Sequence, residues 1–204
     1  MLLVVKRSTA IRHLVEVAES ATDRLDFRAT DLGWPLEELG VTGELLEPVV
    51  ELDHGSVVLM IDLPPEELPW LAAHPTAQWI GEQVRLGKRP LQWTYRPTAW
   101  PPWTYRDRRV VRFWSATAGV DDDTINAMRE HRPLKVVEPD KEALADQLDV
   151  ERSLARTHLK SILERYWDRD WRRDNRYGTS PEDQLWRAAT VLTEIDSALD
   201  DLSR

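Results

Sequence analysis

The sequence contains no cysteine and no long run of apolar residues. Without cysteine, the chain can have no disulfide bond, no thiolate metal site and no cysteine nucleophile. No unbroken apolar run is longer than the one from Val57 to Ile61, whereas a membrane-spanning helix needs about 20 residues. The apolar start of the chain ends at Val5, which is too early for the core of a signal peptide. The sequence therefore predicts a soluble, cytoplasmic protein that does not enter a membrane.

Several motifs of nucleotide-binding and hydrolytic enzymes are also missing. The chain has no phosphate-binding P-loop, no Gly-x-Gly-x-x-Gly, no Gly-x-Ser-x-Gly and no His-Glu-x-x-His. The five histidines are scattered, and no two have metal-ligand spacing on one helix face. The consecutive acids Asp121 to Asp123 begin a predicted helix, where their carboxylates diverge instead of converging on a cation. We therefore predict no metal site and no cofactor.

Hydrophobic periodicity in the first two thirds of the chain indicates a mixed fold. A helix is predicted from Ser8, because apolar residues from Ile11 to Leu25 recur at three- and four-residue steps. Runs rich in β-branched residues predict two buried strands, at 57–63 and 109–115. The sequence further predicts a strand at 27–34, short helices at 43–50, 76–86 and 121–129, and an irregular or edge segment at 90–102.

The C-terminal third has the pattern of two long helices. Helical periodicity runs for about 30 residues from Pro139, and a turn is predicted at 175–179. The sequence Ser180-Pro181-Glu182-Asp183 then has the capping serine, first-position proline and early acids of a helix start. We therefore expect an α/β (α+β) domain over residues 1–135 and a helical hairpin over residues 136–204.

The charge is distributed unevenly along the chain. The whole chain carries −9, yet the segment from residue 83 to residue 114 has eight basic residues and one acid, a local charge of +7. Five of the ten tryptophans lie in or beside this basic aromatic stretch. Such rings and arginines bind single-stranded nucleic acid in some proteins, but the rings also fill cores with arginines stacked on them. The candidate ligand-binding residues are Arg85, Lys88, Arg96, Trp100, Trp103, Arg106 and Arg108.

The order of predicted elements resembles a nucleotidyltransferase-like domain, with a small mixed sheet, flanking helices and a helical appendage. Active nucleotidyltransferases hold Mg²⁺ and nucleotide through a Gly-Ser turn, an Asp-x-Asp pair and a third carboxylate on a later strand. In this chain Gly33 is followed by Trp34, and Asp53 and Asp62 are too far apart to copy the pair. The strand at 110–114 carries no carboxylate. The resemblance therefore implies the fold without the metal site.

The chain also resembles, nearly end to end, a family of actinobacterial proteins of unknown function. The similar segments are residues 11–14 (Ile-Arg-His-Leu), 58–70, 85–88 and 183–188. In addition, the Arg-x5-His spacing of Arg152 and His158 resembles the active-site motif of helical HEPN ribonucleases.

Two classes of function follow from these patterns. The first is a non-catalytic, nucleotidyltransferase-like binding or regulatory protein, a pseudoenzyme. The second is an enzyme of unrecognised mechanism, either a divergent nucleotidyltransferase using Asp53 and Asp62 or an HEPN-like ribonuclease using Arg152 and His158. A protein partner is open in either class, whereas the net charge of −9 disfavours nucleic acid or nucleotide as the ligand.

Overall fold

The computed structural model describes residues 5–23, 34–173 and 180–204. The chain is a mixed α+β protein with two compact units. The sheet unit comprises Met1–Leu63 and Thr76–Glu138, and the helical unit comprises Pro64–Pro75 and Pro139–Arg204. Residues 64–75 therefore belong with the C-terminal helices, although they lie between two elements of the sheet unit in the sequence.

The elements of the sheet unit are short and closely spaced. Its strands are β1 (Val5–Lys6), β2 (Leu36–Thr42), β3 (Glu51–Leu52), β4 (Gly55–Ile61), β5 (Leu91–Pro97), β6 (Val110–Ser115) and β7 (Gly119–Val120). Its helices are α1 (Arg7–Asp23), α2 (Pro75–Gln83) and α3 (Asp122–Arg129), with 3-10 turns η2 (Gly43–Leu46) and η4 (Leu86–Lys88).

Five strands form the main sheet in the order β5-β4-β2-β6-β7. Strands β4 and β5 are parallel, and the other neighbours are antiparallel. The predicted interior strand at 57–63 is confirmed as β4, because its run of apolar side chains is buried between two neighbouring strands. The predicted strand at 109–115 is confirmed as β6. The proline-rich segment forms edge strand β5, where a residue without an amide hydrogen is tolerated.

Strand β2 was not expected from the sequence. Its alternation is disguised by Glu37 and Glu38 and by register shifts against both neighbours. Gly40 lies within it because a Cβ there would come within 2.7 Å of Val110 Cγ1. The strand predicted at 27–34 falls largely outside the described residues. The helix predicted at 43–50 is only the 3-10 turn η2.

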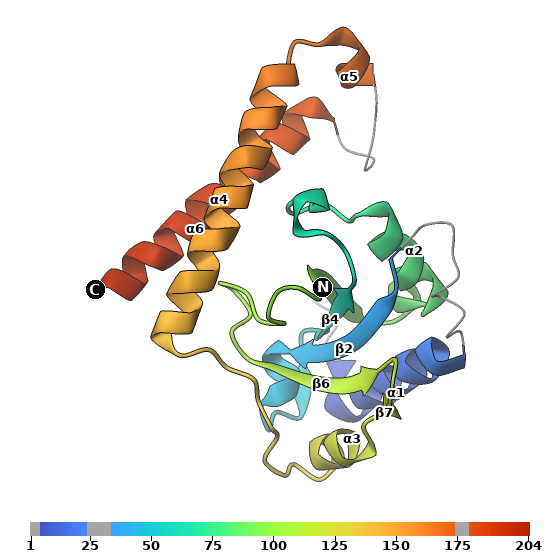
Figure 1. The fold of residues 1–204 in the computed structure, drawn as a ribbon. Helices are drawn as coiled ribbons and strands as arrows, with labels where there is room; N and C mark the ends of the chain where they lie inside the picture. Colours follow the sequence, from blue (N-terminus) through green and yellow to red (C-terminus); the bar gives the residue numbers. More distant parts are fainter. Residues whose placement is uncertain (1–4, 24–33, 174–179) are drawn as a thin grey trace. The chain divides into compact units, whose positions relative to one another are not determined.

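Helix α1 contacts β7 and α3, and it runs beside the sheet in Figure 1. The buried Arg7 begins this helix and donates hydrogen bonds to the carbonyl oxygens of Leu45 (2.7 Å) and Met128 (3.3 Å). Near the end of α1, Thr22 Oγ1 accepts a hydrogen bond of 2.8 Å from the indole Nε1 of Trp114. These contacts connect the helix to segments distant in the sequence.

The helical unit is an antiparallel hairpin with a short segment from the middle of the chain. It contains η3 (Pro65–Glu67), α4 (Lys141–Arg165), α5 (Arg169–Arg173) and α6 (Pro181–Ser203). Helices α4 and α6 pack side by side (Figure 1). The predicted start of α6 is confirmed, since the Ser180 side chain accepts from the backbone amide of Asp183. The described part of the chain has no helix with both the length and the apolar character needed to cross a bilayer.

Candidate functional site

A pocket of about 300 Å³ lies within the helical unit. This volume is at the lower end of the range for small-molecule sites. The pocket is enclosed by the segment around η3, by α4 and by residues from α5 and α6. Its lining residues are Pro65, Glu66, Glu67, Leu68, Trp70, Leu154, Thr157, His158, Ser161, Ile162, Arg165, Trp171 and Gln184.

One stripe of α4 supplies the polar part of the pocket. Lining residues occur at 154, 157, 158, 161, 162 and 165, which are the three- and four-residue steps of a single helix face. Residues Leu144, Leu148 and Ala155 are buried on another part of the same helix. Helix α4 therefore has a core-forming face and, next to it, a face that leaves polar groups at the pocket.

His158 is the titratable centre of this stripe. Burial lowers the pKa of its imidazole, and the neighbouring charge of Arg165 lowers this pKa further. The ring is therefore neutral at pH 7 and offers one hydrogen-bond donor and one acceptor. Within the described ranges, neither ring nitrogen of His158 has a hydrogen-bond partner. A polar group in this position needs water or a ligand to satisfy it.

Arg165 is held in a defined orientation by its own helix and by α5. Its Nε donates to the Ser161 carbonyl oxygen at 3.1 Å, and its Nη2 donates to Ser161 Oγ at 2.6 Å. Its Cζ lies 5.6 Å from the centroid of the Trp171 ring. No carboxylate among the described residues forms an ion pair with this guanidinium. The pocket therefore contains an oriented cation that is available to an anionic group.

The loop after η3 has an unusual backbone. Trp70 (φ 22°) and Leu71 (φ 54°) are consecutive residues with positive φ, a region that costs non-glycine residues about 1–3 kcal/mol each. The Arg187 side chain of α6 donates a hydrogen bond from Nη1 to the Leu71 carbonyl oxygen. Strain of this kind is retained where surrounding contacts enforce it. Here the contact from Arg187 holds the loop that brings Trp70 to the pocket.

The candidate residues of the basic aromatic stretch all lie in the sheet unit, and the structure separates them into buried and exposed groups. Arg96, Trp100 and Trp103 are buried, and Arg96 Cζ lies 4.9 Å from the Trp100 ring centroid. Arg106 is exposed with its Cζ 5.5 Å from the Tyr105 ring centroid. The exposed candidates without an ion pair among the described residues are Arg85, Lys88 and Arg108.

Other arginines of this stretch are paired with acids of the sheet unit. Arg89 contacts Glu16 at 3.2 Å, and His13 contacts the same carboxylate at 3.0 Å. Arg112 contacts Glu38 at 2.9 Å. Arg109 pairs with Glu47 and with Glu138. Part of the local positive charge is therefore neutralised within the protein, and ligand binding by the exposed candidates stays a prediction.

The structure separates the members of both proposed catalytic pairs. Arg152 pairs with Asp149 and Asp196, whereas His158 lines the pocket. Six residues along a helix correspond to 600°, so these two side chains leave α4 about 120° apart. Asp53 precedes β4 and Asp62 follows it. Nine residues of extended chain span about 30 Å, which is too far for both carboxylates to hold one metal ion.

Sequence reasoning did not find the pocket. The sequence pattern that indicates the pocket is the polar stripe of Thr157, His158 and Ser161, whose helical spacing predicts a second, polar face on α4. Nothing in the sequence indicated that residues 64–75 would pack beside that stripe. In the part of the chain that the structure describes, no three His, Asp or Glu side chains form a group able to hold a metal ion.

A comparison with protein families assigns nearly the whole chain. Residues 5–201 match the family model described as a domain of unknown function, DUF7711. The chain belongs to the DUF7711 family. No curated protein and no solved structure gives a significant match. The DUF7711 domain therefore includes both the sheet unit and the helical unit with its pocket.

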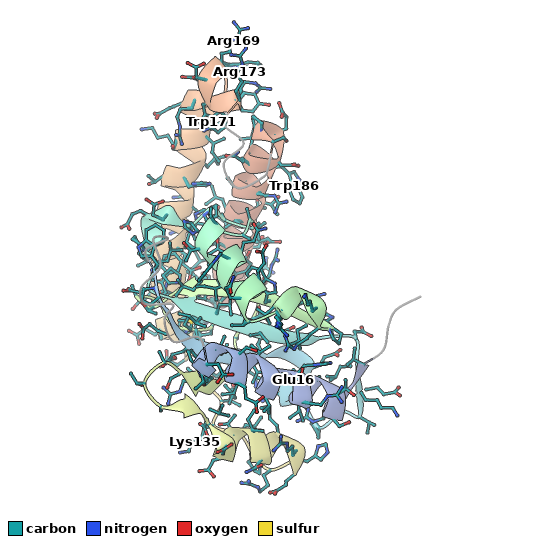
Figure 2. The ribbon with its side chains drawn as sticks, turned by 90° about the vertical axis from the view of Figure 1, so that its right-hand side faces the viewer. Glu16, Lys135, Arg169, Trp171, Arg173 and Trp186 are labelled. Carbon is teal, nitrogen blue, oxygen red and sulfur yellow. The ribbon has the colours of Figure 1, made fainter. Side chains whose placement is uncertain are left out.

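This DUF7711 domain also exposes two large aromatic side chains on its helical unit. Trp167 is 83% exposed and Trp186 is 63% exposed. Figure 2 shows Arg169 and Arg173 pointing away from the hairpin at its α5 end, and Trp186 on the outer side of α6. Tryptophan and arginine are enriched among residues that dominate protein–protein binding energy. These exposed residues are candidates for contact with a protein partner.

Proposed function

We propose that this chain is a non-catalytic binding protein and that the pocket of the helical unit is its ligand site. The observation that carries the proposal is that His158 and Arg165 both line the pocket. Among the described residues, His158 has no hydrogen-bond partner and Arg165 has no ion pair, so both can bind a ligand. The strained loop at Trp70 and Leu71 supports the same site, because such strain is concentrated at ligand sites.

The arrangement favours binding over catalysis. Ser161 Oγ already accepts a hydrogen bond from Arg165, and a guanidinium cannot remove the proton of a serine hydroxyl. The Thr157 hydroxyl donates to the Ser153 carbonyl oxygen on its own helix at 3.0 Å. A nucleophile activated by a neighbouring base is therefore missing from this stripe, and the groups that remain are hydrogen-bond donors, acceptors and aromatic faces.

Retention of a small molecule tests this proposal. The full chain is incubated with the low-molecular-weight fraction of a cell extract, collected by ultrafiltration and heated, and the released compounds are identified by mass spectrometry. A Ser161→Phe variant fills the pocket and serves as the blocked control. We expect a compound that the unmodified chain retains unchanged and that Ser161→Phe does not retain.

Two results would contradict the proposal in different ways. Equal retention by the unmodified chain and by Ser161→Phe would show that the pocket is not the binding site. Conversion of an extract compound into a new product by the unmodified chain, but not by His158→Gln, would show an enzyme. Circular dichroism of each variant establishes that the comparison is made between folded proteins.

A protein partner is the second candidate, and the exposure of Trp167 and Trp186 favours it. A partner captured by the unmodified chain should be lost from the double variant Trp167→Ala and Trp186→Ala. It should be retained by Ser161→Phe if this surface and the pocket act separately. Capture that is unaffected by the double variant would exclude this surface.

A further inference from the structure

We propose that the pocket recognises a small molecule that combines a planar ring, one acidic group and an N–H donor at some distance from the acid. This inference rests on the proposed function and names the chemistry of its ligand. It follows from how donors, acceptors and aromatic rings are distributed over the lining.

The acidic group is recognised by the α4 side of the pocket. Arg165 is fixed through Ser161 and Trp171, so its free N–H groups are already oriented before a ligand arrives. His158 is neutral and can donate one hydrogen bond to the same anion. A fixed guanidinium with an adjacent donor is a strong combination for a carboxylate or a phosphate.

The N–H donor is recognised by the η3 side of the pocket. Glu66 and Glu67 line it, and no basic group among the residues the structure describes forms an ion pair with either carboxylate. These acceptors bind an amine or a pair of ring N–H groups, and they repel a second negative charge on the ligand. The ligand therefore has one acidic group at one end only.

The planar ring is recognised by the apolar and aromatic remainder. Trp70 comes from the strained loop, while Leu68 and Ile162 supply apolar surface next to it. The guanidinium of Arg165 lies over the indole ring of Trp171, and both groups are planar and can stack on a ligand ring. The volume of about 300 Å³ admits a single ring system with its acid.

Two sources supply this chemistry, and the experiment distinguishes them. A purine nucleoside monophosphate carries a ring with N–H donors and a phosphate, and free L-tryptophan carries an indole ring with an N–H donor and a carboxylate. Isothermal titration of the full chain uses four probes: guanosine monophosphate, guanosine, L-tryptophan and inorganic phosphate. Guanosine lacks only the acid, whereas inorganic phosphate lacks both the ring and the N–H donor.

We expect either guanosine monophosphate or L-tryptophan to bind, and inorganic phosphate alone to bind at least about tenfold more weakly. Arg165→Gln should lower the affinity for the probe that binds by about tenfold or more, since it removes a charge-assisted hydrogen bond. Arg156→Gln is the matched control, because Arg156 lies on the same helix but pairs with Asp196. It should leave the affinity unchanged.

The outcomes separate this inference from the proposed function. Equal binding of guanosine and guanosine monophosphate, with no binding of L-tryptophan, would show that the pocket does not recognise an acidic group. Unchanged affinity in Arg165→Gln would show the same. If the extract experiment finds a retained compound but neither acidic probe binds, the ligand class is wrong and the binding function stands. If the unmodified chain retains no compound and binds no probe, both are wrong.

Discussion

The sheet unit and the helical unit of this chain use their charged and aromatic residues differently. In the sheet unit, Arg89 and Arg112 pair with nearby acids, and Arg96 stacks on the buried Trp100. In the helical unit, Arg165 lies over the Trp171 ring and lines a pocket without an acidic partner among the described residues, and Trp167 is exposed. The basic aromatic stretch, conspicuous in composition, therefore has part of its charge matched internally, whereas Arg165 in the less conspicuous helical unit lines a pocket without an ion pair among the described residues.

This difference shows why local composition is a poor guide to a binding site. A run of arginines and tryptophans is visible in the sequence, but its chemistry depends on which acids the fold brings to it. The helical unit has a less unusual composition, yet its fold brings an arginine without an ion pair and a histidine without a hydrogen-bond partner, among the described residues, to one pocket. Which polar groups of a chain meet at a pocket is shown by the structure and not by composition.

The largest effect should come from the core of the sheet unit. Phe113 on β6 has no solvent exposure, so Phe113→Ala should lower the free energy of unfolding by about 3–5 kcal/mol. The measurement is urea denaturation followed by circular dichroism. Leu163 of α4 is 54% exposed, and Leu163→Ala is expected to change stability by less than about 0.5 kcal/mol. A similar loss of unfolding free energy in both variants would contradict the distinction between the buried core of the sheet unit and the exposed surface of α4.

A smaller effect is expected at the hydrogen bond that holds the strained loop. Arg187→Met removes the donor to the Leu71 carbonyl oxygen and should destabilise the chain by about 1–3 kcal/mol. Arg204→Met, at the exposed C-terminal end of α6, is the control and should have little effect. Hydrogen exchange at residues 68–72 should also become faster in Arg187→Met only. Unchanged exchange there would show that other contacts hold the loop.

The pH dependence of stability should distinguish His158 from an exposed histidine. Because burial lowers its folded-state pKa, the unfolded chain binds the proton more readily, and stability should fall as the pH drops below about 6.5. The charged groups at the same pocket are Arg165 from α4 and Glu66 and Glu67 from η3. Melting between pH 7.5 and pH 5.5 stays above the usual range of glutamate titration.

The variant His158→Gln should lose less of its melting temperature over this pH range than the unmodified chain. His131→Gln, which alters an exposed histidine of the sheet unit, should behave like the unmodified chain. Equal losses in all three proteins would show that proton binding by His158 does not affect folding.

Much of the fold could be predicted from local patterns. Strand β4 is a continuous β-branched and apolar run, and α6 begins with a capping serine followed by proline, so each segment carries its own signal. Strand β2 has no such signal, because glutamates and two register shifts interrupt its alternation. The packing of residues 64–75 with the helices depends on contacts distant in the sequence, such as that of Arg187 with Leu71.

The site was predictable only in its parts. His158 drew attention through its spacing from Arg152, but the pair is separated around α4 and does not form a site. The other residues that line the pocket with His158 include ones from η3, α5 and α6, which no local motif connects. A pocket assembled from four elements is a property of tertiary structure, so its residues could be suspected individually but not grouped.

The smallest effect should be found when the basic aromatic stretch is tested with nucleic acid. Phosphate contacts require arginines that are free of internal partners, and several arginines here are paired with acids or stacked on aromatic rings. We therefore expect no binding of single-stranded RNA or DNA at about 50 mM salt, measured by fluorescence anisotropy, and no change with Arg106→Ala and Arg108→Ala together. Binding that weakens steeply with salt and is lost in this double variant would show that the exposed arginines form a nucleic-acid surface. It would also reverse the comparison between the two units, because the sheet unit would then hold a binding site of its own.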